Sequence, residues 1–360
     1  MLPTEEHRAY LALALIPGIG PARLGNLRQA FGSYRGALAA PFGLLRTVPA
    51  MTRAAATAVA NRDQAAVDRV EESLHRLGGR VITPLDLEFP AGLSAIVDPP
   101  VMLFAEGRVE LLDRLTVAIV GSRHPTHYGI EVTRMVAGLA AGAGIAVASG
   151  MARGLDAVAH WAAVGQPGGT IGVLGNGLGV IYPAANRSLY RRVAVEGLLV
   201  TEYPPGERPH GGSFQRRNRL ISGLARATIV VEGREGSGAL ITAGAASDQG
   251  RDVLAVPGPI TSRLSQGPNA LVRDGATPYL GPADLWRLFP EVGSEAIPTE
   301  RAVLIHRPRR VLETLDGVPR TVDDLAEVLG WAPADIAGAL TELEVVGLAE
   351  RGPAGFIRSP

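Results

Sequence analysis

The sequence contains neither cysteine nor lysine in its 360 residues. Without cysteine the protein cannot form disulfide bonds, thiolate nucleophiles or cysteine-ligated zinc sites, and this composition fits a reducing compartment. Without lysine, all 35 basic residues are arginines, whose planar fork can hold a phosphate through two hydrogen bonds. Glycine and proline are also abundant, with 45 and 27 residues. We therefore attribute the arginine content to compositional bias rather than to a function.

Net charge and long apolar runs are also lacking. The 35 acidic residues balance the 35 basic ones, so total charge does not support a nucleic-acid partner and any basic surface must be local. No apolar run reaches the roughly 18 residues that a membrane-spanning helix needs. Glu5 and Glu6 lie where a secretory signal requires positive charge. We therefore expect a cytoplasmic protein, and the apolar fraction of 46% predicts a sizeable core.

Residues 1–76 are expected to form a small helical domain. Apolar residues recur at helical spacing over residues 9–16, 23–31 and 55–77. The string PGIG at residues 17–20 separates the first two patterns. A short glycine hairpin between helices resembles the helix-hairpin-helix element, which can present backbone N–H groups to a DNA phosphate. A simple tight turn explains the same residues equally well.

Over residues 77–290, the sequence pattern changes to that of strands alternating with helices. The helical patterns include residues 129–142 and 154–164. Nearly continuous apolar strands joined by helix-length connections predict an α/β, Rossmann-like parallel sheet covered on both faces, with ligands at the carboxyl ends of the strands. The predicted strands are Val117–Val120, Ile145–Ala148, Thr170–Leu174, Leu198–Val200, Thr228–Val231 and Asp252–Val256.

The last part of the chain predicts a linker and a second small domain. Proline, glycine and serine interrupt the pattern around residues 291–305, which are expected to be a linker. In residues 306–360, three helical patterns precede the string LAERGPAGFIR, which predicts a two-stranded wing. The third helix of this winged-helix layout carries Asp335, Glu342 and Glu344 and no arginine. Because a DNA-reading helix normally needs basic or amide side chains, a protein-contact or vestigial role is favoured.

Two predicted strands end in glycine turns of the kind that bind phosphate. The string IVGSRHPTHYG begins at Ile119, and SGMARGLDAVAH begins at Ser149. A glycine at a strand end lets the backbone approach a phosphate, and the next helix N-terminus favours an anion. The candidate residues of these two turns are Gly121, Ser122, Arg123, Ser149, Gly150, Arg153 and Gly154.

Asp156 and His160 are four residues apart and therefore share a helix face. They are either a catalytic or ligand pair or a packed histidine beside a helix N-terminal aspartate, and the packed arrangement is favoured. No credible nucleophile–base pair and no metal cluster accompanies them, so we expect no enzymatic activity and no metal.

The string GNGLG at residues 175–179 resembles a dinucleotide-binding turn, but its third glycine comes one position early. Pro183 follows before any helix, and no clear acidic residue lies about 20 positions later. We therefore predict no nicotinamide or flavin cofactor.

The string FQRRNR at residues 214–219 places an aromatic ring beside arginines. Single-stranded nucleic acid is held in this way, with phosphates on guanidinium groups and bases on a ring. Phe214, Arg217, Asn218 and Arg219 are therefore candidate binding residues. Alternatively, Phe214 packs in the core, Arg219 braces a loop and Asn218 caps a following helix.

A third glycine-rich turn follows the predicted strand Thr228–Val231. Ser237 and Gly238 precede a helical pattern, so their N–H groups are candidate anion donors. Glu232 at the strand end is either a general base or an ion-pair partner of Arg217 or Arg219, and the ion pair is favoured because no partner acid or nucleophile accompanies it.

Taken together, these strings resemble the DprA/Smf family of DNA processing proteins. The resemblance runs from about Ile16 to about Pro278, with a winged-helix appendage after it. It implies a Rossmann-like core preceded by a helical domain of the SAM or helix-hairpin-helix type. The strings that carry it are IPGIG, DPPVMLF, IVGSRHPTHYG, SGMARGLDAVAH, VLGNGLGVIYPAAN, TEYPPG, FQRRNRLISGL, SGALITAGAASDQGRDVLAVPG and QGPNALVRDGA.

The resemblance also implies a binding function without catalysis. Family members bind single-stranded DNA, dimerise through the Rossmann-like domain and help to load the RecA recombinase in natural transformation and recombination. By similarity, the GSR turn holds a phosphate, Phe214 stacks a base and Arg217 to Arg219 complete a basic pocket. The family often has a lysine shortly before Phe214, where this chain has Arg208 and His210. Dimer contacts are expected near Gly267–Ala276.

An enzymatic alternative comes from a more distant resemblance to phosphoribohydrolases, which hydrolyse nucleotides. Those enzymes carry a PGGxGTxxE string with a catalytic glutamate. This chain has only PGGTIGVLG at residues 167–175, without that glutamate at the proper spacing.

Overall fold

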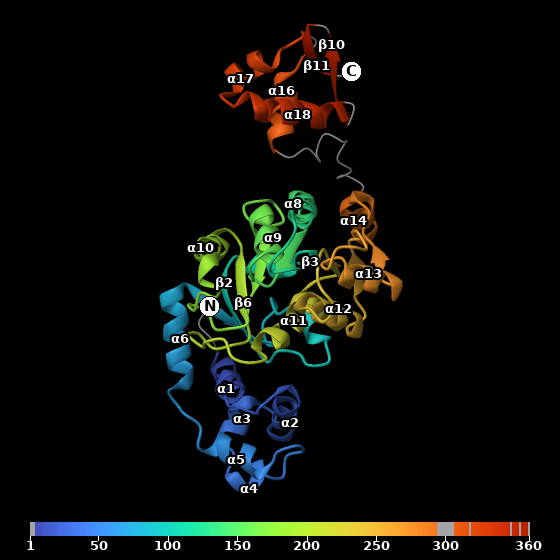
Figure 1. The fold of residues 1–360 in the computed structure, drawn as a ribbon. Helices are drawn as coiled ribbons and strands as arrows, with labels where there is room; N and C mark the ends of the chain where they lie inside the picture. The colour runs from blue at the N-terminus through green and yellow to red at the C-terminus, as the bar shows by residue number, and fades with distance from the viewer. Residues whose placement is uncertain (1–3, 294–305, 317, 346–347, 353, 359–360) are drawn as a thin grey trace. The chain divides into compact units, whose positions relative to one another are not determined.

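The computed structural model describes residues 4–293, 306–316, 318–345, 348–352 and 354–358. The chain divides into two compact units, Met1–Phe289 and Pro290–Pro360 (Figure 1). Residues 294–305, which hold most of the predicted linker, lie outside the described residues. None of the helices within the described ranges is long and apolar enough to cross a membrane.

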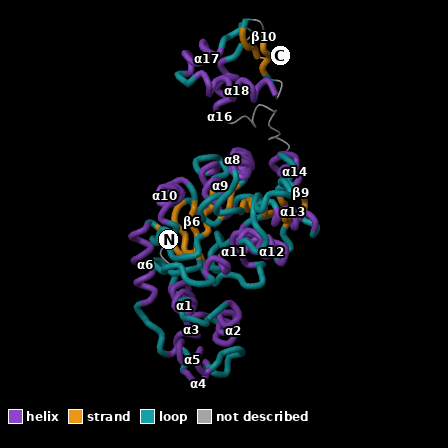
Figure 2. Tube along the Cα trace, viewed as in Figure 1, coloured by secondary structure: helices purple, strands orange, loops and turns teal. Residues whose placement is uncertain are grey.

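A sheet forms the centre of the first unit, with its strands in orange in Figure 2. It has nine strands, in the order β1-β2-β6-β5-β4-β3-β7-β8-β9. All pairs among β3 to β9 are parallel, whereas β2 is antiparallel to both of its neighbours. Strands β3 to β7 are buried at every position, because helices cover both faces of a parallel sheet. The bounds are β1 Gly79–Ile82, β2 Leu103–Gly107, β3 Thr116–Val120, β4 Ala146–Ser149, β5 Thr170–Val173, β6 Leu198–Thr201, β7 Ala227–Val230, β8 Asp252–Ala255 and β9 Thr277–Pro278.

The six predicted strands are confirmed as β3 to β8, each within two residues of its expected bounds. Strands β1, β2 and β9 were not predicted as strands. β1 and β9 are short edge strands with little apolar content, and neither carries the continuous apolar run that marks a central strand. The first two residues of β2, Leu103 and Phe104, lie in the string DPPVMLF, which was interpreted only as a family motif.

Helices cover the sheet on both sides. α8 His127–Gly142, α9 Leu155–Ala163 and α10 Arg187–Glu196 lie on one face, and α11 Ser213–Leu224 and α12 Gly238–Asp248 lie on the other (Figure 1). Leu220, Ile221 and Ala243 of the second group share an apolar core with the sheet. This arrangement confirms the Rossmann-like fold. The remaining elements of this part are α7 Ala91–Ser94, α13 Gln266–Arg273, α14 Pro282–Leu288 and the 3-10 helices Val109–Asp113 and Ala184–Asn186.

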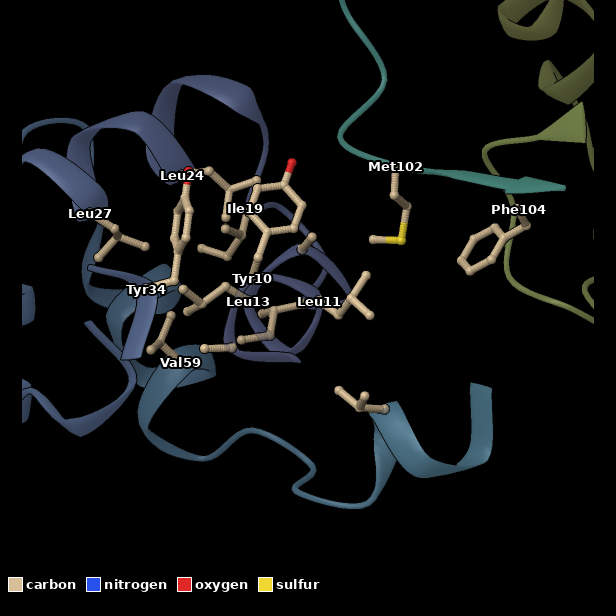
Figure 3. Close-up of a cluster of buried hydrophobic side chains, with 14 of the residues drawn as sticks. Tyr10, Leu11, Leu13, Ile19, Leu24, Leu27, Tyr34, Val59, Met102 and Phe104 are labelled. Carbon is tan, nitrogen blue, oxygen red and sulfur yellow. The ribbon is translucent and has the colours of Figure 1, made fainter. Parts of the chain in front are cut away.

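The N-terminal helices share a core with the sheet rather than standing apart (Figure 3). Buried side chains of these helices form one apolar cluster with Met102 and Phe104, and the Tyr10 hydroxyl donates to the Val101 carbonyl at 2.6 Å. The domain boundary expected after residue 76 therefore stays a prediction. The helices are α1 Glu5–Ala14, α2 Pro21–Phe31, α3 Tyr34–Ala39, α4 Phe42–Leu45, α5 Arg53–Ala60 and α6 Ala66–Leu77.

The helical pattern predicted over residues 55–77 is interrupted in the structure. Residues 55–77 form two helices, α5 and α6, instead of one. The Asp63 carboxylate accepts a hydrogen bond from the Ala65 N–H at 3.0 Å. An aspartate that bonds the backbone two residues on favours a turn, and this local bond competes with helix continuation.

The second unit is a winged helix, as predicted. After the short α15 Pro290–Gly293, it consists of α16 His306–Thr314, α17 Val322–Leu329 and α18 Pro333–Val345, and of the antiparallel wing β10 Ala349–Gly352 and β11 Gly355–Arg358. Thr321 and Asp324 form a reciprocal capping box that fixes the start of α17. Leu325, Ile336, Leu340 and Leu343 are buried in its core.

Candidate nucleic-acid interface

The carboxyl ends of β3, β4 and β7 meet at a cavity of about 780 Å³. β3 pairs with β4 on one side and with β7 on the other, so this is the point at which the strand order reverses and where ligands of such sheets bind. The cavity brings together turns that lie far apart in the sequence. Its lining includes the predicted residues Gly121, Ser122, Arg123, Phe214, Arg217, Asn218, Ser237 and Gly238.

A second cavity of about 410 Å³ adjoins the first and shares Arg123, Phe214 and Arg217 with it. Gly150 and Arg153 line this second cavity. Ser149, Gly154 and Arg219 are absent from the linings of both. The structure therefore gathers most of the predicted residues at one edge of the sheet.

Four arginines give this edge a local positive charge in a chain of zero net charge. Arg123, Arg153, Arg234 and Arg263 are exposed and line the two cavities. Within the described parts of the chain, no carboxylate forms an ion pair with any of them. Such side chains are free to hold an anionic ligand.

Arg234 and Arg263 were missed by sequence reasoning. Arg234 comes four residues after β7, so its place near a strand end was a usable signal. Arg263 comes eight residues after β8, too far from its strand for a sequence pattern to place it.

Arg217 is buried, and its role differs from that of the exposed arginines. Its guanidinium donates to the carbonyl oxygens of Gly150 and Val173. It therefore ties the turn after β4 to the end of β5. Burial lowers the pKa of Arg217 to about 10, against the attraction of the nearby Asp156 carboxylate. At neutral pH the group stays charged, and it contributes positive potential to the cavity wall.

The side chains of Arg219 and Asn218 bond to other residues of the protein and are not free for a ligand. Arg219 forms a two-pronged ion pair with Glu202, at 3.0 and 2.8 Å, and a further one with Asp98 at 3.2 Å. This geometry matches the loop-bracing alternative. Asn218 does not cap a following helix, because α11 already begins at Ser213. Its amide instead accepts from Arg217 and donates to the Gly238 carbonyl, each at 3.2 Å.

Glu232 makes neither of the predicted ion pairs. It is 2% exposed, and its carboxylate accepts from the Thr126 N–H at 3.0 Å and from the Thr126 hydroxyl. Thr126 is the N-cap of α8, so the charge of Glu232 lies at the positive end of a helix. That site satisfies the buried carboxylate, which explains why Glu232 turns away from Arg217 and Arg219.

Asp156 and His160 are packed residues, as favoured from the sequence. The His160 ring is fully buried, contacts the Thr170 hydroxyl oxygen at 2.7 Å and accepts from the Met151 N–H at 3.3 Å. Burial lowers the pKa of His160 to about 3, so the ring is neutral. Asp156 accepts from the Ala152 N–H at 3.3 Å, while burial raises its pKa against the effect of Arg217. Both side chains hold the turn that carries Arg153.

The two predicted phosphate turns are locked together. Gly154 has φ of +76°, and a Cβ there would clash with the Ser122 carbonyl. The Leu155 N–H donates to that same carbonyl at 3.1 Å. Ser149 is fully buried and donates to the Ile119 carbonyl at 2.6 Å. Ser149 and Gly154 thus fix the positions of Arg123 and Arg153 rather than facing the cavity.

The remaining wall contains the start of α12 and the ring of Phe214. Ser237 is the N-cap of α12 without a side-chain capping bond, and its hydroxyl oxygen has no partner in the described structure. Free groups at a helix N-terminus favour an anion. Phe214, in the first turn of α11, is half-buried and lines both cavities. The described residues contain no group of three or more His, Cys, Asp or Glu that could hold a metal ion.

The N-terminal hairpin lies at a different cavity, of about 500 Å³. Residues 17–20 lie between α1 and α2 and form part of its wall, together with Glu202 and Arg216. Arg216 is the one arginine among the lining residues of this cavity, and it is paired with Glu202 at 3.3 Å. The wall therefore offers no unpaired arginine to a phosphate, and this geometry gives the DNA-binding hairpin no added support over the tight turn.

Comparisons with known proteins identify relatives over most of the chain. Residues 80–290 match the family described as DNA recombination-mediator protein A, and residues 300–355 match the DprA winged helix domain. A putative DNA processing protein DprA from Mycobacterium tuberculosis is 41% identical over 80% of this chain and 78% of its own length. Protein Smf from Escherichia coli is 37% identical over 77% of each chain.

Two solved structures have the same fold. DNA processing protein A from Streptococcus pneumoniae has a TM-score of 0.65 and 32% identity, over 80% of this chain and 98% of its own. The Helicobacter pylori protein, whose structure is described as giving insight into its single-stranded DNA binding mode, has a TM-score of 0.55 and 28% identity, over 59% of this chain and 96% of its own. The chain belongs to the DprA/Smf family of DNA processing proteins.

Proposed function

We propose that this protein binds single-stranded DNA in the two adjoining cavities without cutting it, and helps to load RecA recombinase onto that strand in natural transformation and recombination. The observation that carries the proposal is the group of four exposed, unpaired arginines beside the half-buried ring of Phe214. Phosphates bind to guanidinium groups and bases stack on aromatic rings in proteins of this kind. The H. pylori relative, described as binding single-stranded DNA, supports the same choice of ligand.

The predicted site residues divide into two groups in this proposal. Contacts to the strand come from Ser122, Arg123, Arg153, Phe214, Ser237 and Gly238, together with Arg234 and Arg263. Positioning of these groups comes from Gly121, Ser149, Gly150, Gly154, Arg217, Asn218 and Arg219, whose side chains or backbones contact other parts of the protein.

Arg208 is the proposed replacement for the family lysine before Phe214. It is exposed, and no ion pair joins it to any described carboxylate. His210, the other candidate, lies 3.5 Å from Glu207 and packs edge-on against Tyr203. An arginine without a partner is the better group for a phosphate contact.

We also propose that the protein acts in the cytoplasm as a homodimer through the Rossmann-like part, near residues 267–276. Arg273 and Asp274 are exposed at the end of α13, while Gly267 and Pro268 are buried within the chain. The dimer contact would therefore use the end of this segment. The acidic α18 of the winged helix is proposed to contact protein rather than DNA.

The decisive experiment is a salt titration of binding to a labelled, unstructured oligonucleotide, with a duplex of the same length as the comparison. The logarithm of the binding constant should fall linearly with the logarithm of salt concentration, by about 0.7 for each phosphate contact on a single strand. Recovery of intact oligonucleotide tests the absence of turnover. Absence of binding at low salt, or release of free base from nucleoside monophosphates, would reject the proposal, and the second result would favour the phosphoribohydrolase alternative.

A further inference from the structure

A second aromatic ring lies beside Phe214. The ring of Tyr182, from the loop after β5, has its centroid 5.2 Å from that of Phe214, with an angle of 30° between the ring planes. This distance is within the range of offset aromatic pairs. Tyr182 is nevertheless 47% exposed, so much of its ring surface faces solvent. An exposed ring next to a proposed stacking residue can itself stack on a nucleic-acid base.

The two rings have different surroundings. Phe214 lines both cavities, whereas Tyr182 lines only the smaller one, of about 410 Å³, together with Arg153. Arg123 lies in the walls of both cavities. Each cavity thus combines an aromatic surface with an unpaired arginine, and the two are joined at Arg123 and Phe214.

The loop that carries Tyr182 is tied to the turn that carries Arg153. The Asn186 side-chain amide donates to the Met151 and Ala152 carbonyls, at 2.9 and 3.0 Å. On the other side of the pair, Gly175 leaves room for Phe214, because a Cβ there would lie 2.7 Å from the ring. The loop of Tyr182 is therefore joined to the turn of Arg153, and this order lowers the entropy cost of binding a flexible strand.

We propose that Tyr182 is a second base-stacking residue, and that the smaller cavity holds the nucleotide next to the one that stacks on Phe214. The inference rests on the proposed function and adds a second nucleotide subsite to it. The rings lie too close for a base to enter between them, so each base lies on a ring surface that faces its own cavity. Arg123, which both cavities share, then faces the phosphate between the two nucleotides, and Arg153 faces the next one.

The test combines variants with oligonucleotides that lack a single base. Binding of a thymidine oligonucleotide and of a series with one abasic position is measured for the wild type and for Tyr182→Ala, Tyr182→Phe and Phe214→Ala. We expect Tyr182→Ala to weaken binding of the complete oligonucleotide by about 5- to 150-fold, and Tyr182→Phe to bind almost as the wild type does, because stacking needs the ring and not the hydroxyl. Trp161→Ala is the matched control, because Trp161 is 44% exposed and lies outside both cavities.

The abasic series distinguishes stacking from a merely structural role. If Tyr182 stacks a base, the loss caused by Tyr182→Ala disappears at one abasic position, and the loss caused by Phe214→Ala disappears at a neighbouring position. A loss from Tyr182→Ala that disappears at the same position as the loss from Phe214→Ala would show that Tyr182 only supports Phe214. An equal loss at every position would show a role that involves no stacked base, and no loss at all would show that the ring is not used. Each of these results overturns the second subsite while DNA binding by the wild type remains. Failure of the wild type to bind overturns the proposed function itself.

Discussion

The guanidinium of Arg217 lies against Gly150, where a Cβ would stand 2.5 Å from Nη1, and it donates to the Gly150 carbonyl. A glycine in a phosphate-type turn thus makes room for a buried arginine, and the arginine fixes the turn. The same guanidinium donates to Val173 and lies near Asp156. One side chain therefore joins the ends of β4 and β5 beneath the proposed DNA path.

Arg217→Ala should unfold more easily than the wild type, by about 1–3 kcal/mol, because it leaves the Gly150 and Val173 carbonyls without their buried donor. Denaturant unfolding measures this change, with Arg134→Ala as the control, since Arg134 is exposed on α8 outside the cavities. Any loss of DNA binding by Arg217→Ala should be accompanied by this loss of stability. Normal stability together with lost binding would instead place Arg217 in direct contact with the strand.

Arg123→Ala and Arg153→Ala should each weaken single-stranded DNA binding by about 1–3 kcal/mol at fixed salt, with little change in stability, because both side chains are exposed and unpaired. Each should also reduce the salt slope by about 0.7, the value for one lost phosphate contact on a single strand. Anisotropy titrations at several salt concentrations measure both quantities. An unchanged slope in both variants would remove these arginines from the proposed site, and Arg134→Ala again provides the comparison.

Gly154→Ala should lower both stability and DNA binding. The backbone at φ of +76° and ψ of −129°, a combination that glycine adopts far more readily than alanine, costs an alanine about 1–3 kcal/mol. The clash with the Ser122 carbonyl adds to this and displaces Arg123. Thermal unfolding and oligonucleotide binding test the two effects. Gly138→Ala is the control, because that glycine is inside α8 and an added Cβ would meet nothing within 4 Å, so the change should stabilise by up to about 1 kcal/mol. If Gly154→Ala and Gly138→Ala had the same thermal stability and the same affinity for the oligonucleotide, the locked arrangement of the two turns would be contradicted.

His160→Gln should flatten the dependence of stability on pH in the acid range. The folded protein holds the pKa of His160 at about 3, whereas an unfolded histidine has a pKa of about 6.5. Between these values the unfolded state binds a proton that the folded state does not, so stability falls as pH falls, by up to about 1.4 kcal/mol per pH unit from this group. Above about pH 6.5 the contribution is complete and constant.

Denaturant unfolding at a series of pH values measures this slope for His160→Gln and for His127→Gln. His127 has 85% of its side chain exposed and pairs with Glu131 on the surface of α8, so its replacement should leave the slope almost unchanged. If the two variants keep the same slope as the wild type, His160 is not the group responsible.

The sheet was predictable because its central strands are buried on both faces, and continuous apolar runs record that burial directly. The short strands β1 and β9 lie at the sheet edges and carry little of this signal. The break between α5 and α6 was missed for a similar reason, since Asp63 decides it through a local bond rather than through periodicity. At the site, Gly121 to Arg123 and Ser237 to Gly238 were found because each follows a recognisable strand.

By itself, the sequence determined the central strands β3 to β8 and the helices between them, the winged helix, the family and the turns at the strand ends, because each depends on residues close together in the chain. Only the tertiary structure decided which arginines are free. Arg219 is engaged by Glu202 and Arg217 by the carbonyls of Gly150 and Val173. Arg234 and Arg263 reach the cavity from separate loops. Whether a charge is available to a ligand depends on partners brought near by folding, and no local pattern records those partners.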